Sequence, residues 1–484
     1  MVTLFDNLTK YSFLRLLEQF FCGWIFLATV VLLVVWALPH TIAARNIALF
    51  TGLIAAFGWV WITKPSLNWK ALWPIICLLL VPLWVMLHWY FLSELKDQQW
   101  QELKSTWLRV LAALLLGSTT GLILNRRPKM VWWVILAMIL LPTITFIQYL
   151  YQVHLQHHWI LPSGMFYGFY KGKFSAVYFV LCQVLIGFGF IYFALNGLQK
   201  ARLLPLLFGT ILVFSGIVDF IAARALNGII VSTLALLLCI LVLLYSSLNV
   251  EGQKRSLKKH LQLGAVALLA LTILGSGLFL FWTYDRQQEG KLANLIGDIR
   301  ISSQIDQNQA WVKDGGASTL PVDDKGRHIN GSTYERVSWF IKGTRLVREN
   351  PLGNGVSHMA FGYYMRAQYP QSSVQMTHSA WVDFTLGLGL PGLILTWCSI
   401  LGVVWLSIRA QNQDRGSGFT EQVVAVGSPI PCIALWLIAG LFGFWIVGEV
   451  SEREYIEHYF FLIALFAAAV SSNKRLEVRE SKGS

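Results

Sequence analysis

Residues 350–392 read NPLGNGVSHMAFGYYMRAQYPQSSVQMTHSAWVDFTLGLGLPG, a stretch that begins polar and ends apolar. A membrane surface is expected to cross it, because only its apolar part suits a bilayer. His378 and Ser379 lie near that crossing, and after a spacer of nine residues come Gly389 and Gly392. A histidine there is partly desolvated yet reachable from outside, so its proton affinity can be tuned for acid–base work. Glycines let backbones pack closely or bend. The stretch therefore predicts a catalytic site at a membrane surface.

The composition excludes an ordinary soluble domain. Of 484 residues, 56% are hydrophobic and only 13% are charged, and the mean hydropathy is +0.57. All six cysteines fall in apolar runs, so neither a disulfide framework nor a zinc site is indicated. The formal net charge of +13 comes largely from basic residues in short loops between apolar runs. That distribution fits membrane topology and anionic phospholipid better than nucleic acid.

The predicted fold is an all-α polytopic membrane protein with about twelve transmembrane helices and one large, partly helical external loop. The apolar runs are 21–37, 46–62, 71–91, 107–124, 130–151, 174–195, 203–221, 226–245, 263–282, 380–408, 429–447 and 455–470. The tenth run carries Gly389, Pro391 and Gly392, so a tilt or break is expected there. No cleavable signal peptide is expected, because the first run is long and further spans follow it.

Lysines and arginines predict the orientation. They are denser in alternate loops, and the rule that cytoplasmic loops are positive then places both termini in the cytoplasm. The chain divides into helices one to nine (1–283), an external loop domain (284–379), helices ten to twelve (380–472) and a cytoplasmic tail (473–484).

The external loop is too long and polar to be an idle connection. Ser332 to Glu335 has the form of a capping box, and Pro351 marks a stop. An amphipathic helix is therefore expected near residues 333–349. Its apolar stripe would consist of Val337, Phe340, Ile341, Thr344 and Val347. Residues 314–330, rich in Gly, Asp and Lys, are expected to form a mobile connection.

Three residues are the main candidates for chemistry. His378 is a candidate general base, although a histidine anchored at the interface is the alternative. Arg224 lies between two apolar runs at the external surface, where a guanidinium can grip a phosphate in bidentate fashion or simply anchor the helix end. Arg336, in the first turn of the expected helix, opposes the helix dipole, so a further partner would explain it; solvated surface charge is the alternative.

Further side chains could contact an anionic substrate. Asp383 is costly to bury without a partner and could orient His378 or meet an arginine. The other candidates are Lys171 and Lys173 beside an aromatic run, Arg345, Arg348, Arg366 and His358 in the loop, and the glutamates 449, 452, 454 and 457 as partners for arginines. For the two lysines an interfacial aromatic belt is an equal explanation.

Several familiar sites are missing from the sequence. It holds no Walker loop, dinucleotide fingerprint or HExxH, and Asp323-Asp324 is adjacent rather than spaced as in a metal-binding Asp-x-Asp motif. No metal or cofactor is therefore expected, and arginines would have to neutralise the negative charge of the substrate. An activated donor such as a polyprenyl-pyrophosphate sugar fits this requirement.

His378-Ser379 followed by Gly389-Leu390-Pro391-Gly392 resembles the signature of bacterial O-antigen ligases, and residues 350–355 resemble the Pro-Leu-Gly-x-Gly run of the wider ligase and polymerase superfamily. The resemblance implies a GT-C-like membrane fold in the bacterial inner membrane, with the site on the periplasmic face. It implies inverting, metal-independent transfer of polysaccharide from undecaprenyl pyrophosphate onto lipid A–core. His378 would be the base, and Arg224 and Arg336 would be the essential arginines.

Three alternatives stay open. An O-antigen polymerase would use the same donor with a second lipid-linked repeat as acceptor, and a protein O-oligosaccharyltransferase would modify periplasmic proteins. A transporter of lipid or polysaccharide is the non-enzymatic alternative. It would carry ionisable residues deep within several spans, and such residues are scarce in the apolar runs.

Overall fold

The computed structural model describes residues 2–159, 164–195, 203–248, 291–313, 320–323, 326–416, 428–447 and 453–471, together with Gly264, Gly275 and Trp282. The described part is helical, and its one β pairing is an isolated bridge between Val322 and His328. Eight of its helices are long and apolar enough to cross a membrane, and three shorter apolar helices accompany them. An all-α membrane protein is thus confirmed. The ninth expected span and the tail from 473 lie outside the described residues, apart from Gly264, Gly275 and Trp282.

The apolar helices have the following bounds: α1 Val2–Val35, α2 Ile42–Thr63, α3 Trp73–Phe91, α5 Leu108–Arg126, α6 Val131–Gln156, α7 Lys173–Leu195, α8 Leu203–Ala222, α9 Leu226–Leu248, α14 Ala380–Gly416, α15 Ile430–Val447 and α16 Arg453–Val470. The remaining elements are short or polar: α4 Lys96–Glu102, the π-helix η1 Leu103–Trp107, the 3₁₀ turns η2 Pro128–Met130 and η3 Ala310–Val312, α11 Lys291–Ser302, α12 Gly331–Glu349 and α13 Ala360–Gln368. Sequence patterns had not predicted α4, α11 or α13.

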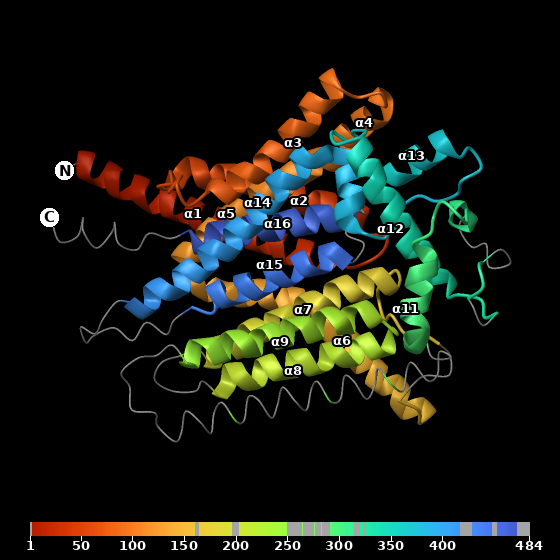
Figure 1. The fold of residues 1–484 in the computed structure, drawn as a ribbon. Helices are drawn as coiled ribbons and strands as arrows, with labels where there is room; N and C mark the ends of the chain where they lie inside the picture. The colour runs from red at the N-terminus through yellow and green to blue at the C-terminus, as the bar shows by residue number, and fades with distance from the viewer. Residues whose placement is uncertain are drawn as a thin grey trace.

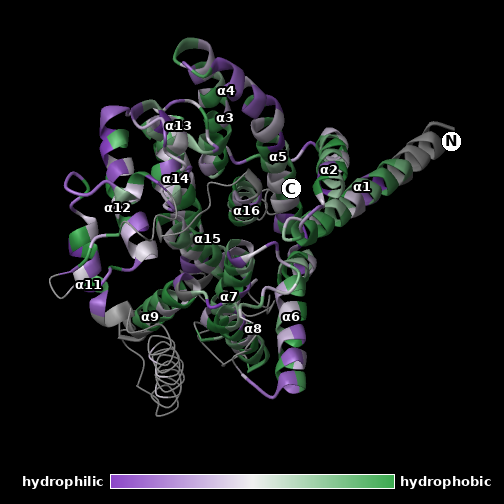
Figure 2. Cartoon of the chain, turned by 90° about the vertical axis from the view of Figure 1, so that its right-hand side faces the viewer, coloured by the Kyte–Doolittle hydropathy of each residue, from purple (hydrophilic) through white to green (hydrophobic). Residues whose placement is uncertain are grey.

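The bundle is organised around α7 and α16. Residues 176–192 of α7 and 455–470 of α16 are buried throughout, whereas the outer helices α1, α2 and α3 leave large apolar side chains exposed on one side. A helix that is apolar all round belongs in the interior, and a helix with an exposed apolar face suits contact with lipid. Figure 1 shows α11, α12 and α13 at one end of the bundle, opposite the start of α1, and Figure 2 shows that these helices and α4 carry much of the polar surface.

Helices α5 and α16 pack backbone to backbone. Gly117 and Gly121 of α5 face α16, and a Cβ on Gly117 would lie 2.6 Å from the Phe461 carbonyl oxygen. A Cβ on Gly121 would collide with the Leu465 carbonyl oxygen. Small residues four positions apart allow this close approach between membrane helices.

We expect Gly121→Ala to destabilise the protein by about 1–3 kcal/mol, because the added methyl group has no room between the two backbones. Gly443→Ala in α15 is the matched control, since a Cβ there meets nothing within 4 Å. That control should leave stability unchanged or raise it slightly, as alanine favours a helix over glycine. Thermal unfolding of both variants in detergent measures the difference, and equal melting temperatures would contradict the tight packing.

The expected amphipathic helix of the loop is confirmed as α12, but its cap and its buried face differ from the prediction. Its N-cap is Asn330, whose side chain accepts from the Thr333 amide at 3.1 Å, so Ser332 does not begin the helix. The buried positions are Tyr334, Ser338, Trp339, Gly343 and Leu346, whereas the predicted stripe Val337, Phe340, Ile341, Thr344 and Val347 is half-buried or exposed.

The buried face of α12 is stabilised by polar atoms that a hydrophobic pattern does not register. Ser338 Oγ donates to the Ser302 carbonyl at 2.9 Å, and Trp339 Nε1 donates to the Trp311 carbonyl at 2.7 Å. Tyr334 donates its hydroxyl to the Asn308 carbonyl at 3.1 Å. Each buried polar group is therefore paired, which makes burial of this mixed face favourable.

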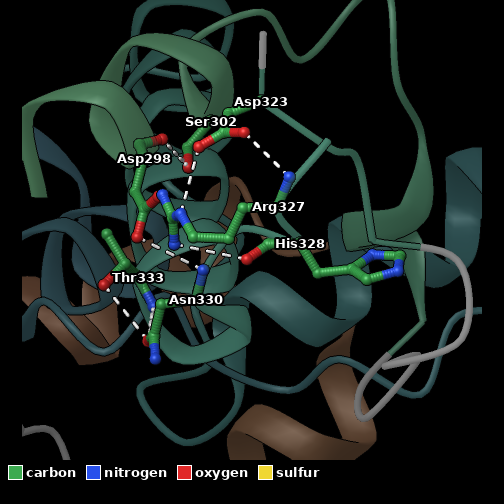
Figure 3. Close-up of polar contacts among 7 residues, drawn as sticks. All are labelled: Asp298, Ser302, Asp323, Arg327, His328, Asn330 and Thr333. Atoms are coloured by element: carbon green, nitrogen blue, oxygen red, sulfur yellow. Dashed lines mark hydrogen bonds and ion pairs between the residues drawn. The ribbon is translucent and has the colours of Figure 1, made fainter. Parts of the chain in front are cut away.

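The described end of the segment expected to be mobile is anchored through Arg327 (Figure 3). Its guanidinium binds Asp298 Oδ1 at 2.5 Å and Asp323 Oδ2 at 3.0 Å. Asp298, buried on α11, also accepts the Asn330 amide at 3.2 Å. These contacts join α11 to the start of α12; residues 314–319, 324 and 325 lie outside the described part.

Candidate functional site

His378 lies between two aromatic rings at the start of α14. Its imidazole is stacked on Trp339 of α12 at a centroid distance of 5.3 Å and on Phe174 of α7 at 6.4 Å. Burial, assisted by the positive charge of Arg336, lowers the pKa of His378 from 6.5 to about 4. The ring is therefore neutral at pH 7, the protonation state in which one ring nitrogen can accept a proton.

The backbone at His378 is held by a local clamp. Thr377 donates its amide to the Asp383 carboxylate at 2.9 Å, and Thr377 Oγ1 accepts from the Ser379 amide at 3.2 Å. His378 itself adopts a left-handed conformation with φ of 59°. Asp383 thus holds the chain next to His378, and its described contacts run to the Thr377 backbone. Ser379 Oγ donates to the Ile446 carbonyl at 3.3 Å, which ties the clamp to α15.

Arg336 lies one helical turn before Trp339 on α12, and its charge acts on His378. Its side chain retains exposed surface, yet the protein around it lowers the pKa of the guanidinium through desolvation, partly offset by Glu335. A cation that is both accessible and poorly solvated favours an anionic ligand beside it. Arg336 and His378 therefore form a small basic site beside the buried ring of Trp339.

Arg224 is placed by the turn between α8 and α9. Its amide donates to the Ile221 carbonyl at 3.0 Å, and its φ of 49° is left-handed, as at the C-terminal cap of many helices. The Phe166 amide donates to the Ala222 carbonyl at 3.0 Å, which fixes residues 164–172 beside this turn. Burial raises the pKa of Tyr167, and the positive charge of Arg224 opposes that rise, so the charge of Arg224 acts on this loop.

Residues 164–174 connect Arg224 to His378. Tyr167 lies near Arg224 at one end, and Phe174 stacks on His378 at the other. Lys171 is exposed between them, and Lys173 is the first residue of α7. This loop therefore runs from the turn that carries Arg224 to the aromatic ring that stacks on His378.

A break in α14 explains the glycine pattern. Gly389 is non-helical, with φ of 70°, which confirms the expected break in the tenth span. The backbone groups released there pair with residues 351–355: the Asn354 amide donates to the Leu386 carbonyl at 2.9 Å, and the Leu390 amide donates to the Pro351 carbonyl at 2.7 Å. A Cβ on Gly353 would lie 2.6 Å from the Gly389 nitrogen. Gly392 belongs to the same crowded bend, where a Cβ would lie 2.7 Å from that of Leu388.

Other candidates have contacts in other parts of the chain. Arg345 forms a bidentate pair with Asp306 at 2.8–3.0 Å on an exposed surface, and it lies roughly 120° around α12 from Trp339. Arg348 is exposed and lies roughly 180° from Trp339. His358 is exposed, and its amide donates to Glu102 at 2.9 Å. Arg366 packs over its neighbour Tyr363.

Sequence patterns missed a set of buried ionisable groups. Arg109 of α5 pairs with Glu457 of α16 at 2.9 Å, and Arg45 of α2 is buried as well. His458 is also buried and lies 3.0 Å from the Tyr178 hydroxyl. Glu457 therefore answers an arginine outside the candidate set. The sequence signal for these groups is a charged residue in the first turns of an apolar run. Such a residue is easily mistaken for an anchor at the membrane interface.

No group of three or more His, Cys, Asp or Glu side chains in the described ranges is arranged to hold a metal ion. The six cysteines are free thiols.

The depressed proton affinity of His378 predicts a pH-dependent stability. Between about pH 6.5 and 4 the unfolded chain binds a proton that the folded chain does not, so stability falls as the pH falls through this window. The free energy of unfolding should fall by less than about 3 kcal/mol, because the ring is partly exposed and solvent screens its charge. His378→Asn, which tolerates the left-handed backbone, should remove this fall. Unfolding of both proteins in detergent from pH 7 to 4 measures the difference; parallel curves would contradict it.

Among known proteins, no family model and no curated protein matches this chain. The resemblance carried by residues 336–392 therefore stays a prediction.

Proposed function

We propose that this protein is an O-antigen ligase, a glycosyltransferase that moves a polysaccharide from undecaprenyl pyrophosphate onto lipid A–core. The site would face the periplasm from the bacterial inner membrane, with both termini in the cytoplasm. The observation that supports this best is the neutral His378 imidazole held between Trp339 and Phe174, with the Arg336 charge close by. A base beside a cation suits a reaction that removes a proton and releases an anion.

In the proposed reaction, a hydroxyl oxygen of the acceptor sugar attacks the anomeric carbon of the donor. The hydroxyl proton passes to a ring nitrogen of His378, while the bond from the anomeric carbon to the diphosphate oxygen breaks. The diphosphate leaves on its lipid with the electron pair of that bond, and Arg336 and Arg224 stabilise its charge. A single displacement of this kind inverts the anomeric centre and needs no metal. In this proposal Lys171 and Lys173 would contact phosphate or sugar beside the reacting groups.

The same geometry suggests how donor binding prepares the base. A pKa of about 4 makes His378 a weak proton acceptor in the free protein, and Arg336 contributes to that weakness. A diphosphate bound at Arg336 would offset the positive charge and raise the proton affinity of the imidazole. Removal of the acceptor proton would then be favoured once the donor is in place.

The decisive experiment uses purified protein with lipid-linked polymer and lipopolysaccharide that ends at the core. A ligase forms core carrying polymer, and its rate is unchanged by EDTA. Longer lipid-linked chains with bare core would indicate a polymerase, and modified periplasmic protein substrates would indicate a protein glycosyltransferase. Absence of any covalent product with active donor would contradict all three enzymatic functions.

A transporter draws support from the buried Arg109–Glu457 pair, since intramembrane charges are common on transport pathways. The positions of the charges favour the enzyme. Arg45 and Glu457 lie within the first two turns of α2 and α16, and Arg109, which follows the continuous helix of α4 and η1, pairs with Glu457 at that level. A transport pathway would require such groups deeper along the helices.

A further inference from the structure

A second polar cluster lies beside the turn that carries Arg224, between α6, α8 and residues 164–172. Asp219, in the last turn of α8, is only 3% exposed, and Thr145 of α6 is likewise 3% exposed. Tyr170, in the connecting loop, is 6% exposed. Neither oxygen of the Asp219 carboxylate has a hydrogen-bond partner in the described part of the chain, nor do the Thr145 and Tyr170 hydroxyls.

Thr145 and Asp219 lie one helical turn before Tyr149 and Ala222, which pack together, so both residues face the interface between α6 and α8. A Cβ on Gly168 would lie 2.6 Å from Thr145 Oγ1, so the loop that carries Tyr170 packs directly on Thr145. Burial raises the pKa of Tyr170 well above its usual value, the Asp219 charge raises it further, and the Thr145 hydroxyl is near enough to oppose that rise. The cluster is closed on the outside by Tyr149, Ala222 and Phe166, which pack together.

Four buried oxygen atoms without partners are unusual, because buried polar groups are nearly always paired. Thr145 is an informative case. Helix threonines such as Thr119 and Thr210 donate to the carbonyl four residues earlier, at 2.9 and 2.8 Å. The Thr145 hydroxyl makes no such bond and is left available to a ligand.

The chemistry of the cluster restricts that ligand. Its donors are oxygen atoms alone, which suits hard cations rather than zinc or copper. A single carboxylate supplies one negative charge, so a monovalent ion gives a neutral buried complex, whereas a divalent ion would leave an uncompensated charge. A proton on Asp219 would still need an acceptor within hydrogen-bonding distance.

We propose that Asp219, Thr145 and Tyr170 form a binding site for a dehydrated monovalent cation, Na⁺ or K⁺, that braces the end of α8. This site is independent of the proposed transfer reaction. The ion would join α6, α8 and residues 164–172, and so would fix the turn in which Arg224 is held. It takes no part in bond making or breaking.

The test measures the melting temperature of the purified protein in choline chloride as Na⁺ or K⁺ replaces choline at constant ionic strength. Separate Na⁺ and K⁺ titrations identify the preferred ion. The wild-type melting temperature should rise and saturate, because a ligand that binds only the folded state stabilises it. Asp219→Asn should abolish the rise, Thr145→Val should weaken it, and Asp306→Asn, an exposed acid in the loop, should retain it.

Equilibrium dialysis with ²²Na⁺ or ⁸⁶Rb⁺ gives a second readout, with one ion bound per wild-type chain. If Asp219→Asn does not fold, Tyr170→Phe and Thr145→Val supply the comparison. Identical melting temperatures in all three salts with no bound ion would overturn the proposal and leave water or a protonated carboxyl in the cluster. A response that Asp219→Asn retains would overturn it as well. Neither result tests glycosyl transfer itself, whose failure would appear in the ligation assay.

Discussion

His378→Ala should lower the rate of polysaccharide transfer by about 10²–10⁴-fold, because a positioned general base contributes that much. The protein should still insert and fold. The measurement is the initial rate of core–polymer formation at matched protein concentration, with donor in excess. His378→Asn should lose as much activity while keeping the left-handed backbone, so a difference between the two variants would report folding rather than chemistry.

His157→Ala is the matched control for this experiment. His157 also has a positive φ, of 54°, and ends α6. His157→Ala therefore replaces a histidine that has the same left-handed backbone conformation as His378. The transfer rate should stay within about twofold of the wild-type rate, because His157 has no proposed catalytic role. Near-normal transfer by His378→Ala would remove His378 from the reaction.

Arg336→Ala should lower kcat/KM by about 10²–10³-fold, the usual loss when one group that stabilises a developing anion is removed. Arg336→Lys should recover only part of this, because an ammonium does not reproduce bidentate binding. Arg345→Ala is the control on the same helix: Arg345 is exposed and paired with Asp306, so transfer should be unchanged.

The Arg336 variant also has a signature that simple misfolding would not produce. Its positive charge helps to lower the pKa of His378, so Arg336→Ala should move the acid limb of the kcat/KM profile to higher pH. Loss of rate without that movement would mean that Arg336 acts only through folding, and the diphosphate contact would have to be reassigned.

The sequence predicted the helical membrane bundle, the break at Gly389 and the existence of α12, because long apolar runs, glycine and helical spacing report directly on local structure. It misplaced the buried face of α12, since Ser338, Tyr334 and Trp339 owe their burial to partners in other segments. The stacking of Trp339 and Phe174 on His378 was also inaccessible, because it joins three elements far apart in the chain. The pairing of Glu457 with Arg109 was inaccessible for the same reason.

The contact between residues 351–355 and the break in α14 has a consequence for biogenesis. The carbonyls of Leu386 and Gly387 accept amides from Asn354 and Gly355, so the backbone of α14 is satisfied only after the preceding segment has folded back against it. Exposed to acyl chains without that segment, the bend would cost several kcal/mol for each unpaired carbonyl. Stable insertion of α14 into the lipid phase is thereby coupled to folding of the residues before it, which gives membrane insertion a built-in order of events.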